Sequence, residues 1–128
     1  MDKVVVQQDN EYRMAVMVKG EADDELHQVA HIHELSPYTM MLASLALCTT
    51  SVLHSYAHHH EVGLELAEIT ATYHREESDD DQPYDEWIEE HVAFNGELSE
   101  QDLDRLTHVA HACSIRKMLA SGIEVKDV

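Results

Sequence analysis

Cysteine, proline and basic residues are all scarce in this sequence. Its two cysteines are too few for a disulfide scaffold, so we expect a reducing, cytoplasmic location. Only 8 Lys and Arg stand against 26 Asp and Glu, which gives a net charge of −18. Such a surface repels phosphate backbones and anionic lipid, so we expect neither nucleic acid nor membrane among its partners. The amino-terminal residues also lack the apolar segment of a signal peptide.

Long apolar runs are nearly absent as well. The uncharged run from residue 35 to residue 53 approaches the length of a membrane span. Because this run contains several serines and threonines and lacks basic flanks, we expect a core helix, one that can be buried between subunits.

The residues that are present suit one domain, residues 1–128. The apolar fraction of 44% is too high for a disordered chain, and this length provides a real core. Residues 3–8 and 12–19 predict two strands of a hairpin, and residues 26–33 predict a third, weaker strand after a turn at residues 20–25. The amino-terminal part is therefore predicted to be a three-stranded β-meander.

A long central helix is predicted over about residues 37–60. Ser36 is a good N-cap, and Pro37 suits the first helical position because no backbone N–H is needed there. No further glycine or proline occurs before Gly63, which we expect to end the helix. The first cysteine, Cys48, lies in the middle of this helix.

A second hairpin is predicted next, with residues 64–75 and 87–94 as strands around an acidic loop at residues 76–86. In the first of these strands, Leu64 and Leu66 lie on one face, whereas the apolar residues that follow lie on the other. This change of the buried face indicates a β-bulge.

A second helix is predicted over about residues 100–120. Ser99 and Asp102 form an acidic variant of the capping box at its start, and helical spacing places Cys113 on its core face. Gly122 marks its end, and residues 123–128 predict a short last strand. The fold class is therefore α+β, with two helices packed on an antiparallel sheet.

Several of these motifs together resemble the OsmC/Ohr family of thiol-dependent peroxidases. The stretch SPYTMMLASLALC is similar to the family's central helix, which has an S-P-Y start, an ALASL-like stretch and a cysteine. A second cysteine in a later helix and a closing Gly-Ile-Glu segment follow in the family's order. The resemblance covers residue 36 to the carboxyl terminus, and the two cysteines at this separation make it specific.

The resemblance implies an intertwined homodimer, with the two central helices packed together, that reduces organic hydroperoxides. Cys48 would be the peroxidatic thiolate, Cys113 the resolving thiol, and a dithiol the reductant. The family supplies an arginine from its amino-terminal sheet, and Arg13 is the only arginine before Cys48. Cys48, Cys113 and Arg13 are therefore the predicted catalytic residues, and no cofactor is expected.

The chain departs from the family pattern at the first turn of the central helix. The family has a glutamate there that holds the arginine, and its position corresponds to Thr39, or to Tyr38 if the alignment shifts by one residue. Neither residue is an acid. The exchange also removes the glutamate of a capping box that Ser36 would begin. Glu34, just outside the helix, is the acid that lies next to this turn.

The surroundings of the cysteines predict different thiol chemistry. A mid-helix thiol in apolar surroundings has a raised pKa unless a cation reaches it, and the helix of Cys48 offers none. Cys113, in contrast, is followed by Arg116 and Lys117 at helical spacing.

Two other interpretations stay open. A protein of this fold without efficient peroxidase activity can bind a small hydrophobic ligand, or sense redox state, at the dimer interface. The eleven histidines suggest a metal-binding module, and His54 and His58 have the spacing of a ligand pair. No third ligand is predictable beside them, so we expect no metal site.

Overall fold

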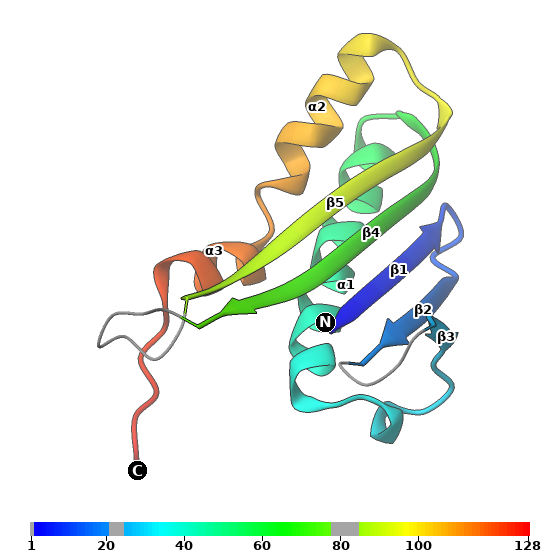
Figure 1. The fold of residues 1–128 in the computed structure, drawn as a ribbon. Helices are drawn as coiled ribbons and strands as arrows, with labels where there is room; N and C mark the ends of the chain where they lie inside the picture. The colour runs from blue at the N-terminus through cyan, green and yellow to red at the C-terminus, as the bar shows by residue number, and fades with distance from the viewer. Residues whose placement is uncertain (1, 21–24, 78–84) are drawn as a thin grey trace.

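The computed structural model describes residues 2–20, 25–77 and 85–128, and the predicted turns at 20–25 and 76–86 lie largely outside this part. One antiparallel sheet in the order β3-β2-β1-β4-β5 forms the body of the fold, and the long helix α1 lies against one face of it (Figure 1). The α+β class predicted from the sequence is confirmed.

The amino-terminal meander is present, but its third strand is much shorter than predicted. β1 (Lys3–Asp9) pairs with β2 (Met14–Lys19), and β2 pairs with β3 (His27–Gln28). The prediction of a strand over residues 26–33 is wrong beyond Gln28, because a 3-10 turn, Ile32–Glu34, follows instead. The Glu34 carboxylate accepts the backbone N–H groups of Ala30 and His31, and these bonds stabilise the turn rather than the start of α1.

The central helix α1 spans Pro37–His59, close to the predicted bounds. Its first turn has a complete capping box, because the Thr39 hydroxyl accepts the Ser36 backbone N–H at 2.8 Å and the Ser36 hydroxyl accepts the Thr39 N–H at 3.2 Å. The capping box is therefore complete without the glutamate, because the Thr39 hydroxyl takes the place of its carboxylate. The left-handed residue that ends the helix is Glu61 (φ 53°), whereas Gly63 already begins the next strand.

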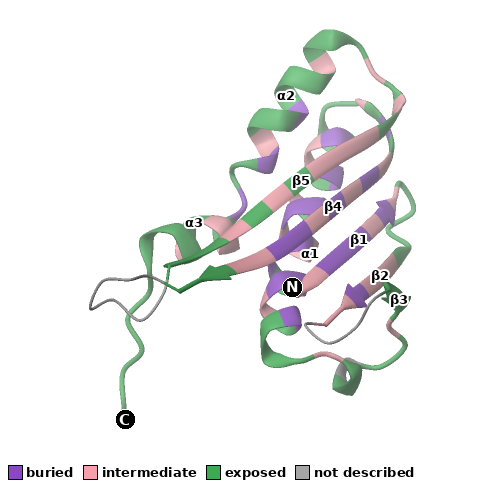
Figure 2. Ribbon diagram, viewed as in Figure 1, coloured by how far each residue is buried: buried purple, intermediate pink, exposed green. Residues whose placement is uncertain are grey.

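The core lies between α1 and the two central strands. β4 (Gly63–Glu76) pairs with β1 on one side and with β5 (Asp85–Glu97) on the other. Buried residues concentrate on β1, β4 and the sheet side of α1 (Figure 2). The register shifts between Leu64 and Leu66, so the predicted bulge is confirmed. Helix α1 has the length and mean hydropathy (1.3) of a membrane span, but half of this stretch is buried inside the protein, as in a core helix.

The predicted second helix is two helices. α2 (Glu100–Ala110) begins with the expected capping box of Ser99 and Asp102, and α3 (Ser114–Ser121) follows after a break at residues 111–113. Leu106, Ala110 and Cys113 are all fully or almost fully buried across the break. The apolar spacing therefore continues through the break, which is why periodicity alone predicted one helix.

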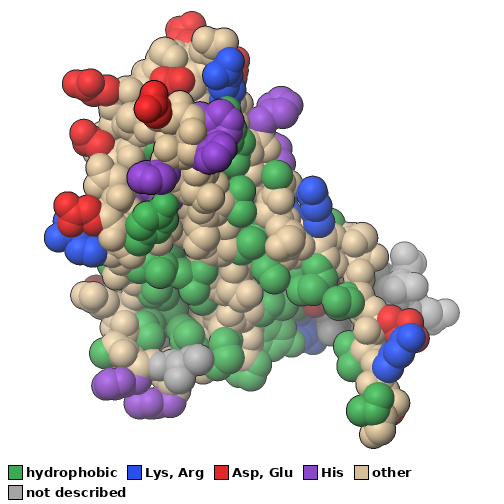
Figure 3. Space-filling model, turned by 180° about the vertical axis from the view of Figure 1, so that it is seen from behind, with side chains coloured by type: hydrophobic (Ala, Val, Ile, Leu, Met, Phe, Trp, Pro, Cys, Tyr) green, Lys and Arg blue, Asp and Glu red, His purple; other side chains and the backbone are tan. Residues whose placement is uncertain are grey.

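The carboxyl-terminal segment is not a strand. Residues after Gly122 extend away from α3, and Val125 is 89% exposed (Figure 1). The prediction of a last strand over residues 123–128 is wrong for the single chain, since the segment reaches neither edge of the sheet and gains no strand partner. Seen from the helix side, apolar side chains also gather on the surface (Figure 3). On α1, Tyr38 and Met40 are exposed.

Candidate active site

The two cysteines lie together where the break between α2 and α3 meets α1. Both are free thiols; Cys48 is half-buried in the middle of α1, and Cys113 is fully buried. Hydrogen bonding between the two thiols affects the pKa of each of them. The structure therefore brings together two residues 65 positions apart in sequence, both predicted from the sequence as site residues.

Cys113 is the N-cap of α3, and this position decides what Cys48 contacts. Its sulfur accepts the backbone N–H of Arg116 at 3.5 Å, where a serine or aspartate oxygen is more usual. The amino end of α3 consequently faces Cys48, with the Ser114 hydroxyl 3.9 Å from the Cys48 sulfur. Hydrogen bonding with the backbone groups of Ile115 and Ser114 also lowers the pKa of Cys48. Amino-terminal N–H groups of a helix stabilise negative charge.

The two thiols differ in acidity as a result. Burial disfavours the Cys48 thiolate, but hydrogen bonds from the Cys113 thiol and from the Ile115 and Ser114 groups outweigh it and lower the pKa of Cys48. Burial raises the pKa of Cys113, and the neighbouring Cys48 raises it further. Cys48 is therefore the better nucleophile, because the thiolate is the reactive form. The expected rise in the pKa of Cys48 is wrong, since backbone donors replace the missing cation.

A buried carboxylate contacts residues that neighbour the two cysteines in sequence. The side chain of Glu90, from β5, is only 4% exposed. It accepts the Thr49 hydroxyl at 3.3 Å and pairs with the Arg116 guanidinium at 3.4 Å. Burial raises the pKa of Glu90, although Arg116 opposes this.

Glu90 and Arg116 also line a cavity of about 620 Å³. The rest of its wall is largely apolar and aromatic, from α1, β4, β5 and α3: Tyr38, Met41, Leu45, Tyr73, Trp87, Ile88 and Leu119. A cavity of this size and lining suits a small organic molecule.

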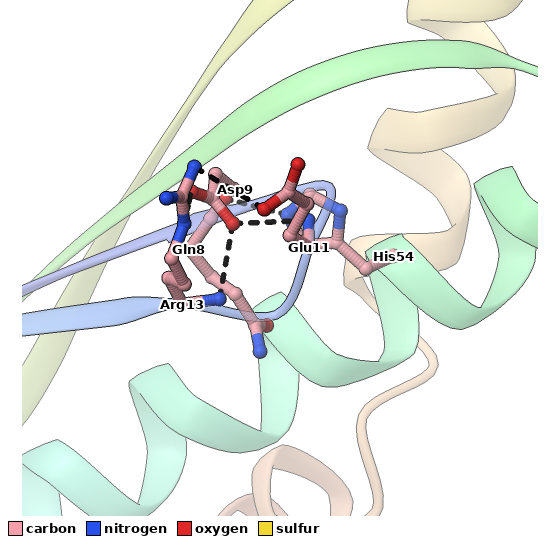
Figure 4. A network of polar contacts seen from close by, with 5 residues as sticks. All are labelled: Gln8, Asp9, Glu11, Arg13 and His54. Atoms are coloured by element: carbon pink, nitrogen blue, oxygen red, sulfur yellow. Dashed lines mark hydrogen bonds and ion pairs between the residues drawn. The ribbon is translucent and has the colours of Figure 1, made fainter.

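Arg13 is not brought to the thiols in the single chain. It lies just before β2, 75% exposed, and pairs with Asp9 at 2.8 Å and with Glu11 at 3.5 Å (Figure 4).

His54 of α1 lies near this turn, with its Nε2 2.6 Å from the Gln8 carbonyl oxygen. That contact gives His54 a structural partner. In the part of the chain that the structure describes, no three His, Cys, Asp or Glu residues gather as a metal site would require.

Comparison with known proteins places this site in a family. A family model described as OsmC-like protein matches residues 30–126, most of the chain. The chain belongs to the OsmC-like family.

Solved structures of OsmC-like proteins share the fold at low identity. An OsmC-like hydroperoxide resistance protein from Jannaschia sp. has a TM-score of 0.64 and 13% identity, with 96% of this chain and 90% of that chain covered. The organic hydroperoxide resistance protein OhrB of Bacillus subtilis has a TM-score of 0.55 and 16% identity, with 98% and 95% covered. An organic hydroperoxide resistance protein from Legionella pneumophila has a TM-score of 0.57 and 18% identity, with 87% and 85% covered. No curated protein matches the sequence.

Three residues of this OsmC-like site, Glu90, Ser114 and Ile115, were missed in the sequence. Glu90 follows another glutamate in an acidic strand, and only the structure shows that one of the two is buried. The donors from Ser114 and Ile115 depend on the helix break, for which the sequence carries no glycine or proline signal. The available signal was the pair Cys113-Ser114, since small polar residues favour helix starts.

We predict that Glu90→Gln becomes more stable relative to the wild type as pH rises from 4.5, the ordinary value for glutamate. A raised folded-state pKa means that Glu90 contributes stability at low pH which is lost as pH rises through that pKa. Each tenfold difference in proton affinity is worth about 1.4 kcal/mol. Urea unfolding of both proteins between acidic and neutral pH measures the difference.

Glu89→Gln is the matched control for this prediction. Glu89 is exposed, and its pKa is lowered by hydrogen bonding to Trp87 and by the nearby His74. Its contribution is therefore present at neutral pH and lost as pH falls, so the stability difference must change in the opposite direction. Parallel pH profiles for the two variants would contradict the assignment of Glu90 as the buried carboxylate.

Proposed function

We propose that this OsmC-like protein is a thiol-dependent peroxidase that reduces organic hydroperoxides. The observation that carries the proposal is that two free thiols interact and that their pKa values are shifted in opposite directions. Cys48 has a lowered pKa and partial access to solvent, whereas Cys113 is buried with a raised pKa. This is the asymmetry that a nucleophile and its resolving partner need.

The reaction has two steps in this proposal. The Cys48 thiolate attacks the terminal oxygen of ROOH, the O–O bond breaks, and the products are Cys48 sulfenic acid and, after protonation of the leaving alkoxide, ROH. Cys113 then attacks the oxidised sulfur, and a Cys48–Cys113 disulfide and water form. A dithiol returns the pair to the reduced state by thiol–disulfide exchange.

The cavity supports an organic rather than an inorganic peroxide. Its aromatic and aliphatic wall favours an apolar R group, and Glu90 and Arg116 lie in the same wall. Thr49, the residue after Cys48, hydrogen-bonds to that Glu90. A hydroperoxide with its R group in the cavity would thus lie beside Glu90, whose partner Thr49 is the residue after Cys48.

We further propose a cytoplasmic homodimer. Two thiols that cycle between reduced and oxidised states need a reducing compartment. Apolar side chains gather on the helix side of the molecule (Figure 3). On α1, Tyr38 and Met40 are exposed, and Val52 and Tyr56 line a shallow hollow together with Val109 of α2. Packing α1 against its copy would bury this surface, as the family resemblance implies.

Any catalytic role of Arg13 also depends on the dimer. Because Arg13 is bound to Asp9 and Glu11 in the single chain, a catalytic role requires the second copy to bring it to Cys48.

We predict that Arg13→Ala slows the oxidation of Cys48 about tenfold, since a cation near a thiolate lowers its pKa by about one unit or more. Stopped-flow oxidation, with Arg105→Ala on α2 as control, measures this. Equal rates for both variants would remove Arg13 from the mechanism and leave Cys48 in it.

A second candidate function rests on the same cavity. The protein can bind a small hydrophobic ligand there without turnover, with the thiols as a redox sensor. Ligand binding that survives Cys48→Ser, together with thiols that resist peroxide, would favour this candidate.

The peroxidase proposal predicts that one equivalent of cumene hydroperoxide removes both thiols of the reduced protein and produces the Cys48–Cys113 disulfide. Cys48→Ser should abolish the reaction, because Cys113 is buried and its pKa is raised. Cys113→Ser should still form a sulfenic acid on Cys48, which then over-oxidises. Thiol titration and intact-protein mass measure all three outcomes.

Two results would contradict this proposal. One is persistence of both thiols for minutes at micromolar peroxide. The other is equal loss of reactivity in both variants with no sulfenic acid trapped on Cys48.

A further inference from the structure

The leaving oxygen of a hydroperoxide needs a positive partner. When a thiolate attacks one peroxide oxygen, the O–O bond breaks and negative charge collects on the other oxygen, where a preorganised donor stabilises it. The groups around Cys48 already interact with its sulfur, among them the Cys113 thiol and the Ser114 hydroxyl at 3.9 Å. The whole chain carries a net charge of −18, which disfavours a further negative charge. A cation at the cavity would offset it.

Arg116 is the cation that the cavity offers. Among the described residues that line the cavity, it is the one Lys or Arg. Arg13 does not line it, and in the single chain Arg13 is paired with Asp9 and Glu11. A guanidinium keeps its charge in proteins and presents its N–H donors in one fixed plane, which suits two bonded oxygens.

A buried carboxylate holds this guanidinium in place. Nη1 of Arg116 lies 3.4 Å from Oε1 of Glu90, whose side chain is only 4% exposed, whereas the Arg116 side chain is 41% exposed. The pair is thus anchored at its carboxylate and accessible at its guanidinium. Within the described chain Glu90 engages Nη1 alone, so the donors on Nε and Nη2 are available to a ligand.

Two further observations connect the guanidinium with the nucleophile. The same Oε1 of Glu90 lies 3.5 Å from the hydroxyl of Thr49, the residue after Cys48. Leu45, which lines the cavity, lies three residues before Cys48 in α1, about 4.5 Å along the helix axis. A hydroperoxide whose R group occupies the cavity can therefore lie with its O–O bond between Arg116 and Cys48.

We propose that Arg116 is a catalytic residue that binds the hydroperoxide and stabilises the negative charge on its leaving oxygen. The assignment rests on the proposed peroxidase, because the leaving oxygen belongs to the first step of that reaction. Glu90 is the positioning residue, since it acts through Arg116.

The step balances with water as the proton source. The Cys48 sulfur forms a bond to the terminal oxygen, which keeps its hydrogen, and the O–O bond breaks. The electron pair of that bond leaves on the RO oxygen, whose charge pairs with the guanidinium until water protonates it. The sulfur is oxidised by two electrons and the peroxide is reduced by two, so the products are Cys48 sulfenic acid, ROH and hydroxide.

Arg116→Ala should slow the oxidation of Cys48 by cumene hydroperoxide about 100-fold, the lower end of what the loss of one preorganised donor costs. Stopped-flow rates are compared on the plateau of the pH–rate profile, where Cys48 is fully ionised in every variant. We expect a lower plateau. A profile that only moves along the pH axis, with equal plateaus, would overturn the assignment, since Arg116 would then act only on the thiolate.

Lys117→Ala is the matched control, because Lys117 is the next residue of α3, carries the same charge, is exposed and does not line the cavity. Its plateau should equal that of the wild type. A double variant, Glu90→Gln with Arg116→Gln, removes the cation without leaving a buried carboxylate unpaired, which protects the test against loss of the fold. It should show the same low plateau as Arg116→Ala.

A second measurement uses no peroxide. Iodoacetate and iodoacetamide alkylate a thiolate by the same reaction and differ by one negative charge. Because a cation near Cys48 attracts iodoacetate, the ratio of the iodoacetate rate to the iodoacetamide rate should fall about tenfold in Arg116→Ala and stay unchanged in Lys117→Ala. Peptide mass measurements follow the alkylation of Cys48.

The outcomes distinguish the two proposals. Equal plateaus in Arg116→Ala and Lys117→Ala would overturn the catalytic role of Arg116 and leave the peroxidase standing. A wild type that does not react with cumene hydroperoxide, with the alkylation ratio still lowered in Arg116→Ala, would instead contradict the peroxidase and keep Arg116 as the group that binds negative charge beside Cys48.

Discussion

The chemistry of the site depends on the contact between the amino end of α3 and the sulfur of Cys48. The break at residues 111–113 allows this contact, because it makes Cys113 an N-cap and turns the first N–H groups of α3 toward α1. One continuous helix would have used those N–H groups in its own backbone ladder. The same break keeps Cys113 in the core, so the Cys113 thiol and the donors of α3 lie together beside α1.

Local donors matter more here because the whole chain is strongly acidic. A net charge of −18 opposes a further negative charge, but salt screens charges that lie beyond about 10 Å. Within that distance the Cys48 sulfur meets the Ser114 and Ile115 N–H groups and the thiol of Cys113. Neutral donors that are fixed in place therefore stabilise the Cys48 thiolate.

The sequence predicted the elements well and their ends less well. Alternation and capping residues gave both hairpins, the central helix and the bulge at Leu64, because these depend on local pattern. The short β3 and the exposed tail after Gly122 were missed, since strand pairing depends on which neighbour the fold supplies. Both cysteines were identified from their helix contexts, whereas the burial of Glu90 follows from the sheet's position against Thr49 and Arg116.

The measurement that tests this account most directly is a pH titration of the Cys48 thiolate. Thiolate absorbance in the ultraviolet is followed for the reduced wild type and for Cys48→Ser, and the difference isolates Cys48. The account predicts a midpoint below that of an ordinary cysteine, about 8.5. A midpoint at or above that value would show that burial outweighs the donors of α3, and would contradict the assignment of Cys48 as the nucleophile.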